Sequence, residues 1–130
     1  MHTSLTIYKA SAGSGKTFTL AVNYMKILIQ NPHSFRSILA VTFTNKATEE
    51  MKLRILSQLY GLSKKLPTSQ PYLDKITTEL HLSADIVSHR AEQALTHLLH
   101  NYNYFRVETI DTFFQSILRN LSRELDLTAN

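Results

Sequence analysis

Apolar residues in the first half of the chain alternate between short continuous runs and longer stretches with helical spacing. Runs rich in apolar and β-branched residues are typical of buried strands, whereas recurrence every three or four residues indicates one face of a helix. Asn31 and Pro32 should end the first helix, and Gly61 should stop the second. The predicted elements are a strand over 5–8, a helix over 18–29, a strand over 37–44 and a helix over 47–59.

The second half of the chain continues with helical spacing and one further strand. A polar stretch with two prolines, residues 63–71, predicts a surface loop. Ser83 is expected to cap a helix, with Leu82 and Val87 placed to form a hydrophobic staple across its start. The predicted elements are helices over 73–80 and 87–98, a strand over 104–110 and a last helix over 114–125.

This order of elements predicts the fold class. Strands that alternate with helices form parallel sheets with right-handed crossovers, so we expect an α/β fold, three-layered around a parallel sheet. Three strands make a small sheet with open edges, and parallel sheets need cover on both faces. The sequence therefore looks like the first part of a larger sheet, with a helical insertion at about 62–102.

Composition narrows the protein class only modestly. With 130 residues and no cysteine, the chain is expected to form one domain without disulfides or thiolate metal sites. Neither a membrane-spanning stretch nor a secretory signal is visible, so we expect a cytoplasmic protein without membrane contact. The net charge of +4 and the pI of about 9.4 permit an anionic partner.

The stretch YKASAGSGKTFTL, residues 8–20, carries the clearest chemistry. It follows a predicted strand and precedes a predicted helix, which is the context of a phosphate-binding loop. Glycines 13 and 15 let successive amides turn toward an anion, and the helix start adds its positive dipole end. Lys16 would reach the β- and γ-phosphates, and Thr17 would ligate Mg²⁺. The predicted phosphate-binding residues are Ala10, Ser11, Ala12, Gly13, Ser14, Gly15, Lys16 and Thr17. The alternative is a chance Gly/Ser loop.

Two further stretches narrow the family. Residues 38–55, ILAVTFTNKATEEMKLRI, resemble motif Ia of the UvrD/Rep-type superfamily 1 DNA helicases, T-F-T-N-K-A-A-x-E-M-x-x-R, with Thr48 in place of an alanine. The loop ASAGSGKT resembles that family's motif I, including its initial alanine. Residues 107–118, VETIDTFFQSIL, are similar to its T-x-H-S-F motif, with Asp111 in place of the histidine. The phosphate loop is most similar to the RecB and AddA helicase–nuclease branch.

The resemblance implies both a fold and an activity. The chain would be part of the first RecA-like lobe of an ATP-dependent helicase that moves 3′→5′ on single-stranded DNA, with ATP and Mg²⁺ as cofactors and Lys16 and Thr17 as catalytic residues. The implied partners are single-stranded DNA, a second lobe on the same polypeptide and a nuclease subunit. The DNA contacts would come from Thr42, Phe43, Thr44, Asn45, Thr109 and Thr112.

The residues leave several alternatives open. Phe43 could stack on a base or lie in the core, and Thr44 could serve as a helix N-cap. Asp111 is expected to be an N-cap, and its carboxylate would repel DNA phosphate. The Asp–Glu pair and the arginines that the family uses for hydrolysis are missing, so we expect a fragment with little ATPase activity of its own. A small P-loop kinase and a non-catalytic interaction module remain as other readings.

Overall fold

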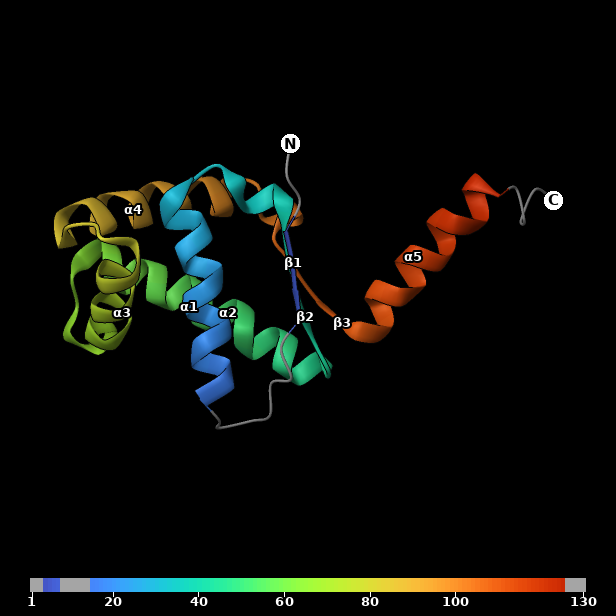
Figure 1. Cartoon of the computed structure of the whole chain (residues 1–130), viewed down its shortest axis with the longest axis horizontal. Helices are drawn as coiled ribbons and strands as arrows, with labels where there is room; N and C mark the ends of the chain where they lie inside the picture. The colour runs from blue at the N-terminus through green and yellow to red at the C-terminus, as the bar shows by residue number, and fades with distance from the viewer. Residues whose placement is uncertain (1–3, 8–14, 126–130) are drawn as a thin grey trace.

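The computed structural model describes residues 4–7 and 15–125. Within these residues the strands and helices follow the predicted order (Figure 1). Three short 3₁₀ turns, η1 (Ser34–Ser37), η2 (Pro67–Ser69) and η3 (Tyr102–Tyr104), join them. The main elements are β1 (Ser4–Ile7), α1 (Gly15–Gln30), β2 (Ile38–Thr42), α2 (Asn45–Lys64), α3 (Gln70–Leu80), α4 (Ala84–His100), β3 (Arg106–Thr109) and α5 (Ile110–Glu124).

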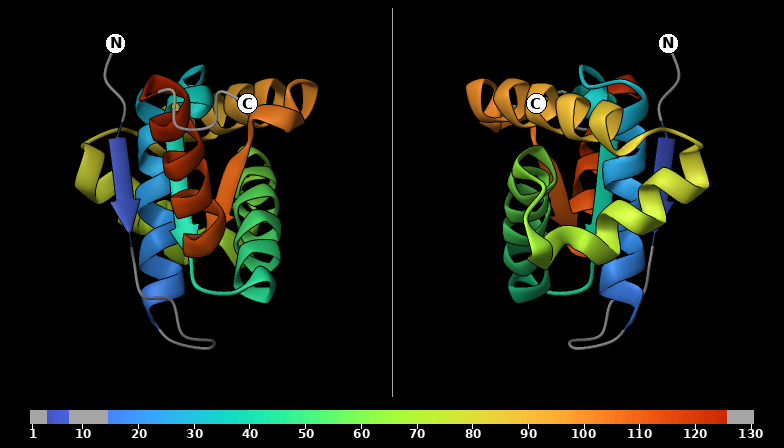
Figure 2. Two further views of the ribbon diagram at one scale, coloured as in Figure 1. Left: turned by 90° about the vertical axis from the view of Figure 1, so that its right-hand side faces the viewer. Right: turned by 90° about the vertical axis from the view of Figure 1, so that its left-hand side faces the viewer.

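The three strands form one parallel sheet in the order β1-β2-β3, which confirms the predicted sheet and the α/β class. Every residue of the central strand β2 is buried. The register pairs Ser4 with Ile38 and Thr42 with Thr109, so neighbouring strands end level with one another. Helices α1 to α4 lie on one side of the sheet and α5 on the other (Figures 1 and 2).

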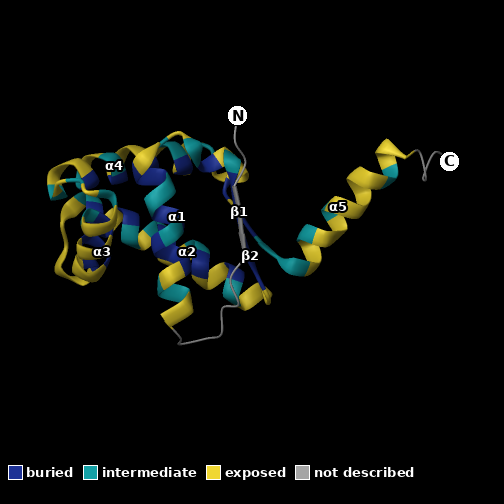
Figure 3. Ribbon diagram, viewed as in Figure 1, coloured by how far each residue is buried: buried dark blue, intermediate teal, exposed yellow. Residues whose placement is uncertain are grey.

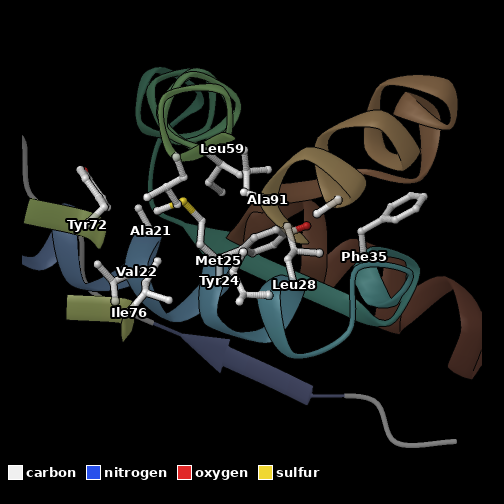
Figure 4. Packing of buried hydrophobic residues seen from close by; sticks show 14 of the residues in the cluster. Ala21, Val22, Tyr24, Met25, Leu28, Phe35, Leu59, Tyr72, Ile76 and Ala91 are labelled. Atoms are coloured by element: carbon white, nitrogen blue, oxygen red, sulfur yellow. The ribbon is translucent and has the colours of Figure 1, made fainter. Parts of the chain in front are cut away.

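The hydrophobic core lies between the sheet and helices α1 to α4. Figure 4 shows how Met25 and Leu28 of α1 gather with Leu59 of α2 and Ala91 of α4, all of which are buried. The segment expected to be an insertion supplies part of this core, since α3 and α4 contribute buried side chains to the same cluster. These side chains are Tyr72, Leu73, Ile76, Val87, Ala91, Ala94 and Leu98.

Helix α2 is longer than predicted, because Gly61 does not stop it. The helix continues to Lys64 and ends at Lys65, which adopts left-handed backbone angles with φ of 53°. Gly61 is instead a point of close approach: a Cβ placed there would lie 1.8 Å from Ser69 Oγ. The predicted loop 63–71 is also wrong in part, since η2 and the start of α3 occupy most of it.

The helix caps show one error, one correct prediction at Ser83, and one alternative left open by the sequence, at Thr44, that the structure confirms. Thr109 caps α5, not Asp111, because the Thr109 backbone is extended and its hydroxyl accepts the Thr112 N–H at 3.2 Å. Asp111 lies in the first turn instead. The strand predicted over 104–110 is correspondingly shorter. Ser83 caps α4 as expected, accepting the Ile86 N–H, and Thr44 caps α2.

Helix α5 has the predicted apolar spacing but no cover. None of its residues is buried, and it leads away from the body of the molecule (Figures 1 and 3). Its large apolar side chains are exposed, namely Phe114, Ile117, Leu118 and Leu121, together with Leu125 just beyond it. Among the described helices, none has the length and apolar character needed to cross a membrane.

Candidate nucleotide and nucleic-acid site

The starts of three helices lie at the carboxyl edge of the sheet. Helix α2 begins three residues after β2 ends, and α5 begins directly after β3. Helix α1 starts at the same end of the molecule (Figures 1 and 2). Unpaired amides and the positive end of the dipole are features of each helix N-terminus, so this edge favours anions. The first turns of α1 and α2 contain no acidic residue.

The described part of the phosphate-binding stretch opens α1. Gly15 and Lys16 are exposed, Thr17 is half-buried, and the Thr19 hydroxyl donates to the Gly15 carbonyl at 3.0 Å. A Cβ built on Gly15 would have no atom of the described residues within 4 Å, leaving aside its two chain neighbours and the backbone of its own helix. The five residues Ala10, Ser11, Ala12, Gly13 and Ser14 lie outside the described residues. The structure therefore places Lys16 and Thr17 in the first helical turn, where the motif requires them.

Thr42 is enclosed at the end of β2. Its side chain is buried, and its Oγ1 lies 2.6 Å from Thr48 Oγ1 and 3.4 Å from the Glu108 carbonyl oxygen. Thr48 in turn donates to the Thr44 carbonyl at 3.2 Å. These contacts join β2, β3 and α2, so the Thr42 hydroxyl holds the edge together and does not face solvent. Sequence reasoning assigned Thr48 no role in this hydrogen-bond network. The one signal for it was that Thr48 replaces an alanine of the family pattern.

Phe43 and the residues after it face solvent. The Phe43 side chain is 46% exposed, so the reading that places it in the core is wrong. Thr44 and Asn45 are also exposed, and the Thr44 hydroxyl accepts the Ala47 N–H at 3.0 Å as the cap of α2. An aromatic face, a hydroxyl and an amide therefore stand together at a helix start, a combination that suits a nucleotide strand.

The third motif lies beside the second because β3 pairs with β2. The Thr109 hydroxyl donates to Thr112 Oγ1 at 3.0 Å, and Thr112 is exposed. Glu108, one residue earlier, is held by Arg106, whose Nη2 lies 3.1 Å from Glu108 Oε2. The other carboxylate oxygen, Oε1, is buried without a hydrogen-bond partner in the described structure. Asp111 adds an exposed carboxylate in the first turn of α5, so the start of α5 attracts phosphate less than the starts of α1 and α2 do.

Comparison with known proteins decides the family. The family model for the UvrD/REP helicase N-terminal domain matches residues 2–130. The chain belongs to the UvrD/REP helicase N-terminal domain family. The stretch at residues 8–20, the strand-to-helix turn at Thr42–Asn45 and the stretch that begins at Thr109 all lie within the matched range. This match covers nearly the whole chain, so the family assignment applies to all the elements described above.

Individual relatives agree with this family. The chain is 33% identical over 125 residues to the RecBCD enzyme subunit RecB of Buchnera aphidicola subsp. Schizaphis graminum, covering 88% of this chain and 10% of the relative. It is 31% identical over 108 residues to RecB of Haemophilus influenzae, covering 78% and 8%. The chain thus spans about a tenth of the length of these relatives. No solved structure matches the chain.

Proposed function

We propose that this chain is the ATP-binding N-terminal portion of an ATP-dependent DNA helicase or translocase, forming part of its first RecA-like lobe over residues 1–130. The observation that supports this best is the placement of Lys16 and Thr17 in the first turn of α1, at the sheet edge where α2 and α5 also begin. The family match gives independent support. The segment at about 62–102 is a helical insertion in this lobe that packs into its core.

The nucleotide phosphates would be held by main-chain amides of residues 10–17 at the start of α1. The ammonium of Lys16 would contact the β- and γ-phosphates, and the Thr17 hydroxyl would hold Mg²⁺. The open space beside Gly15 and the lack of acidic residues in the first turn of α1 fit a triphosphate at this position. Bound Mg²⁺ would supply charge neutralisation at the phosphates, which is the main requirement of phosphoryl transfer.

Single-stranded DNA would cross the same edge of the sheet. The exposed ring of Phe43 would stack on a base, while Thr44, Asn45 and Thr112 would contact the DNA backbone. Thr42 and Thr109 would act by position, since Thr42 is buried and Thr109 caps α5. A shift of the sheet edge on nucleotide binding would then move the DNA contacts.

The complete enzyme would need groups that these residues lack. An Asp–Glu pair to position Mg²⁺ and water, and arginines to stabilise the transferred phosphoryl group, would come from the remainder of a longer polypeptide with a second RecA-like lobe. The complete enzyme would translocate 3′→5′ along single-stranded DNA. It would act in the cytoplasm. The uncovered apolar face of α5 would pack against that remainder. A nuclease subunit would be a further partner, and the names of the relatives as RecBCD enzyme subunits support assembly with other subunits in general.

Isothermal titration calorimetry with ATP and Mg²⁺ tests the proposal. The 130-residue chain should bind ATP–Mg²⁺, and Lys16→Ala should weaken the affinity by at least tenfold. Lys46→Ala is the matched control, because Lys46 is exposed near the start of α2 and lies 4.0 Å from Glu50. A chain that folds by circular dichroism but binds no ATP–Mg²⁺ would instead support a non-catalytic interaction module.

A further inference from the structure

A second surface of interest lies at the opposite end of the sheet from the candidate site. Turn η1 leads into β2 and η3 leads into β3, so both turns lie at the amino ends of the parallel strands. Arg36 of η1 reaches across to Asn101, which precedes η3, and its Nη2 donates to Asn101 Oδ1 at 3.0 Å. The two turns therefore form one continuous surface.

Exposed aromatic rings and cations are paired on this surface. The Arg36 guanidinium lies 4.1 Å from the ring centroid of Tyr104, and Lys52 Nζ lies 5.7 Å from that of Tyr102. The Tyr104 side chain is 50% exposed and that of Tyr102 is 43% exposed. We call these four residues, Arg36, Lys52, Tyr102 and Tyr104, the amino-end surface.

The two tyrosine rings are not required by the core. Phe35 of η1 and Phe105, which follows η3, are buried aromatic residues beside the amino-end surface, and the Phe105 ring packs edge-on against Tyr24 with centroids 5.8 Å apart. Tyr102 packs edge-on against Phe105 with centroids 5.7 Å apart and still exposes 43% of its side chain. The exposed ring area of Tyr102 and Tyr104 is therefore available to a ligand.

Acidic residues are sparse around the amino-end surface, although Glu49 and Glu50 precede Lys52 on α2, where Glu50 lies 4.0 Å from Lys46. Residues 1–48 contain no Asp or Glu, and neither do residues 93–107. The rings of His33, which precedes η1, and His97 contact each other at an interplanar angle of 48° with centroids 4.0 Å apart, and neither ring carries negative charge. The next acidic residue along β3, Glu108, is paired with Arg106. Segregation of this kind in a chain with a net charge of +4 attracts polyanions.

We propose that the amino-end surface binds single-stranded nucleic acid, with bases stacked on Tyr102 and Tyr104 and phosphates contacted by Arg36 and Lys52. Flat ring faces interleaved with cations match bases interleaved with phosphates, and a guanidinium keeps its charge while it lies on a ring. An acidic protein segment would use the cations but would leave the ring faces unmatched. The inference deepens the proposed function by giving its DNA a second contact, remote from the nucleotide.

Fluorescence anisotropy with a labelled oligo(dT) strand tests the inference on the 130-residue chain. Tyr104→Ala should weaken binding by about fivefold or more, since stacking on one aromatic side chain contributes about 1–3 kcal/mol. Tyr104→Phe should bind like the parent chain because it keeps the ring. Tyr60→Ala is the matched control, since Tyr60 is 51% exposed on α2, and should bind unchanged. Circular dichroism of each variant reports folding.

A second measurement separates stacking from simple charge attraction. A 5-iodouracil oligonucleotide crosslinked by light should label the peptide that contains Tyr102 and Tyr104. Binding of poly-glutamate with an affinity equal to that of oligo(dT), unchanged by Tyr104→Ala, would overturn the inference in favour of an acidic protein partner. Equal loss of DNA binding in Tyr60→Ala and Tyr104→Ala, or no DNA binding at all, would also overturn it. ATP–Mg²⁺ binding, measured separately, would still decide the proposed function.

Discussion

Replacing Gly61 by alanine tests how the structure departs from helix propensity. Gly61 lies within α2, where the exchange of glycine for alanine would ordinarily stabilise a helix by about 1 kcal/mol. In this fold the new Cβ would meet Ser69 Oγ at 1.8 Å and Ser69 Cβ at 2.9 Å, well inside the ordinary contact distance of 3.4–4 Å. Ser69 is buried and precedes α3, so it cannot move freely.

The magnitude follows from these contacts. Ser69 Oγ donates to Gln58 Oε1 at 2.7 Å, and its displacement would cost this partly buried hydrogen bond, about 0.5–1.5 kcal/mol. Overpacking adds about 1–3 kcal/mol. After the gain in helix propensity is subtracted, Gly61→Ala should destabilise the chain by about 0.5–3.5 kcal/mol, which lowers Tm by about 4 °C for each kcal/mol.

Urea and thermal unfolding followed by circular dichroism measure this effect. A double variant, Gly61→Ala with Ser69→Gly, removes both clashing atoms, so the alanine should cost less in the Ser69→Gly background than in the parent chain. A stability for Gly61→Ala that equals or exceeds that of the parent would refute the close approach of η2 to α2. An equal cost in both backgrounds would show that Ser69 is not the obstacle.

Three further predictions follow from buried or paired polar groups. Burial raises the pKa of Tyr24, whose hydroxyl has no hydrogen-bond partner in the described structure, so the free energy of unfolding should fall as the pH rises above about 10. In alkaline urea melts, Tyr24→Phe should remove this loss and stabilise the chain by about 1 kcal/mol. Hydrogen bonds from Lys26 and Lys75 lower the pKa of Glu79, so the ionised carboxylate stabilises the fold above its ordinary pKa and this stabilisation is lost in acid. Glu79→Gln should therefore reduce the fall in the free energy of unfolding as the pH is lowered. Thr109→Ala should speed hydrogen exchange in the first turn of α5. The global free energy of unfolding should stay within about 1 kcal/mol of that of the parent chain, because α5 buries no side chain.

The sequence predicted the type and order of the elements because burial imposes clear spacing on them. The run at 37–44 becomes the buried strand β2, and the apolar face at 18–29 becomes the core face of α1. The caps at Thr44 and Ser83 were also readable, since a hydroxyl before a helical pattern has few other uses.

Other features depended on contacts that local patterns do not contain. Gly61 resembled a helix stop, but its small size serves the approach of Ser69 from a later turn. The spacing of α5 indicated a buried face, whereas Phe114 and Leu118 are exposed. At the candidate site the exposure of Phe43 could not be read from its type, and the enclosure of Thr42 depends on its bond to Thr48.

The position of bound nucleotide phosphates is the most direct test of the central claim, that the start of α1 is a phosphate site. NMR amide shifts of the 130-residue chain, titrated with Mg²⁺ and a non-hydrolysable ATP analogue, would locate them. The account predicts the largest shifts at Gly15, Lys16 and Thr17 and none at Tyr60. Saturable binding that leaves the amides of residues 15–17 unchanged and shifts another surface would contradict it.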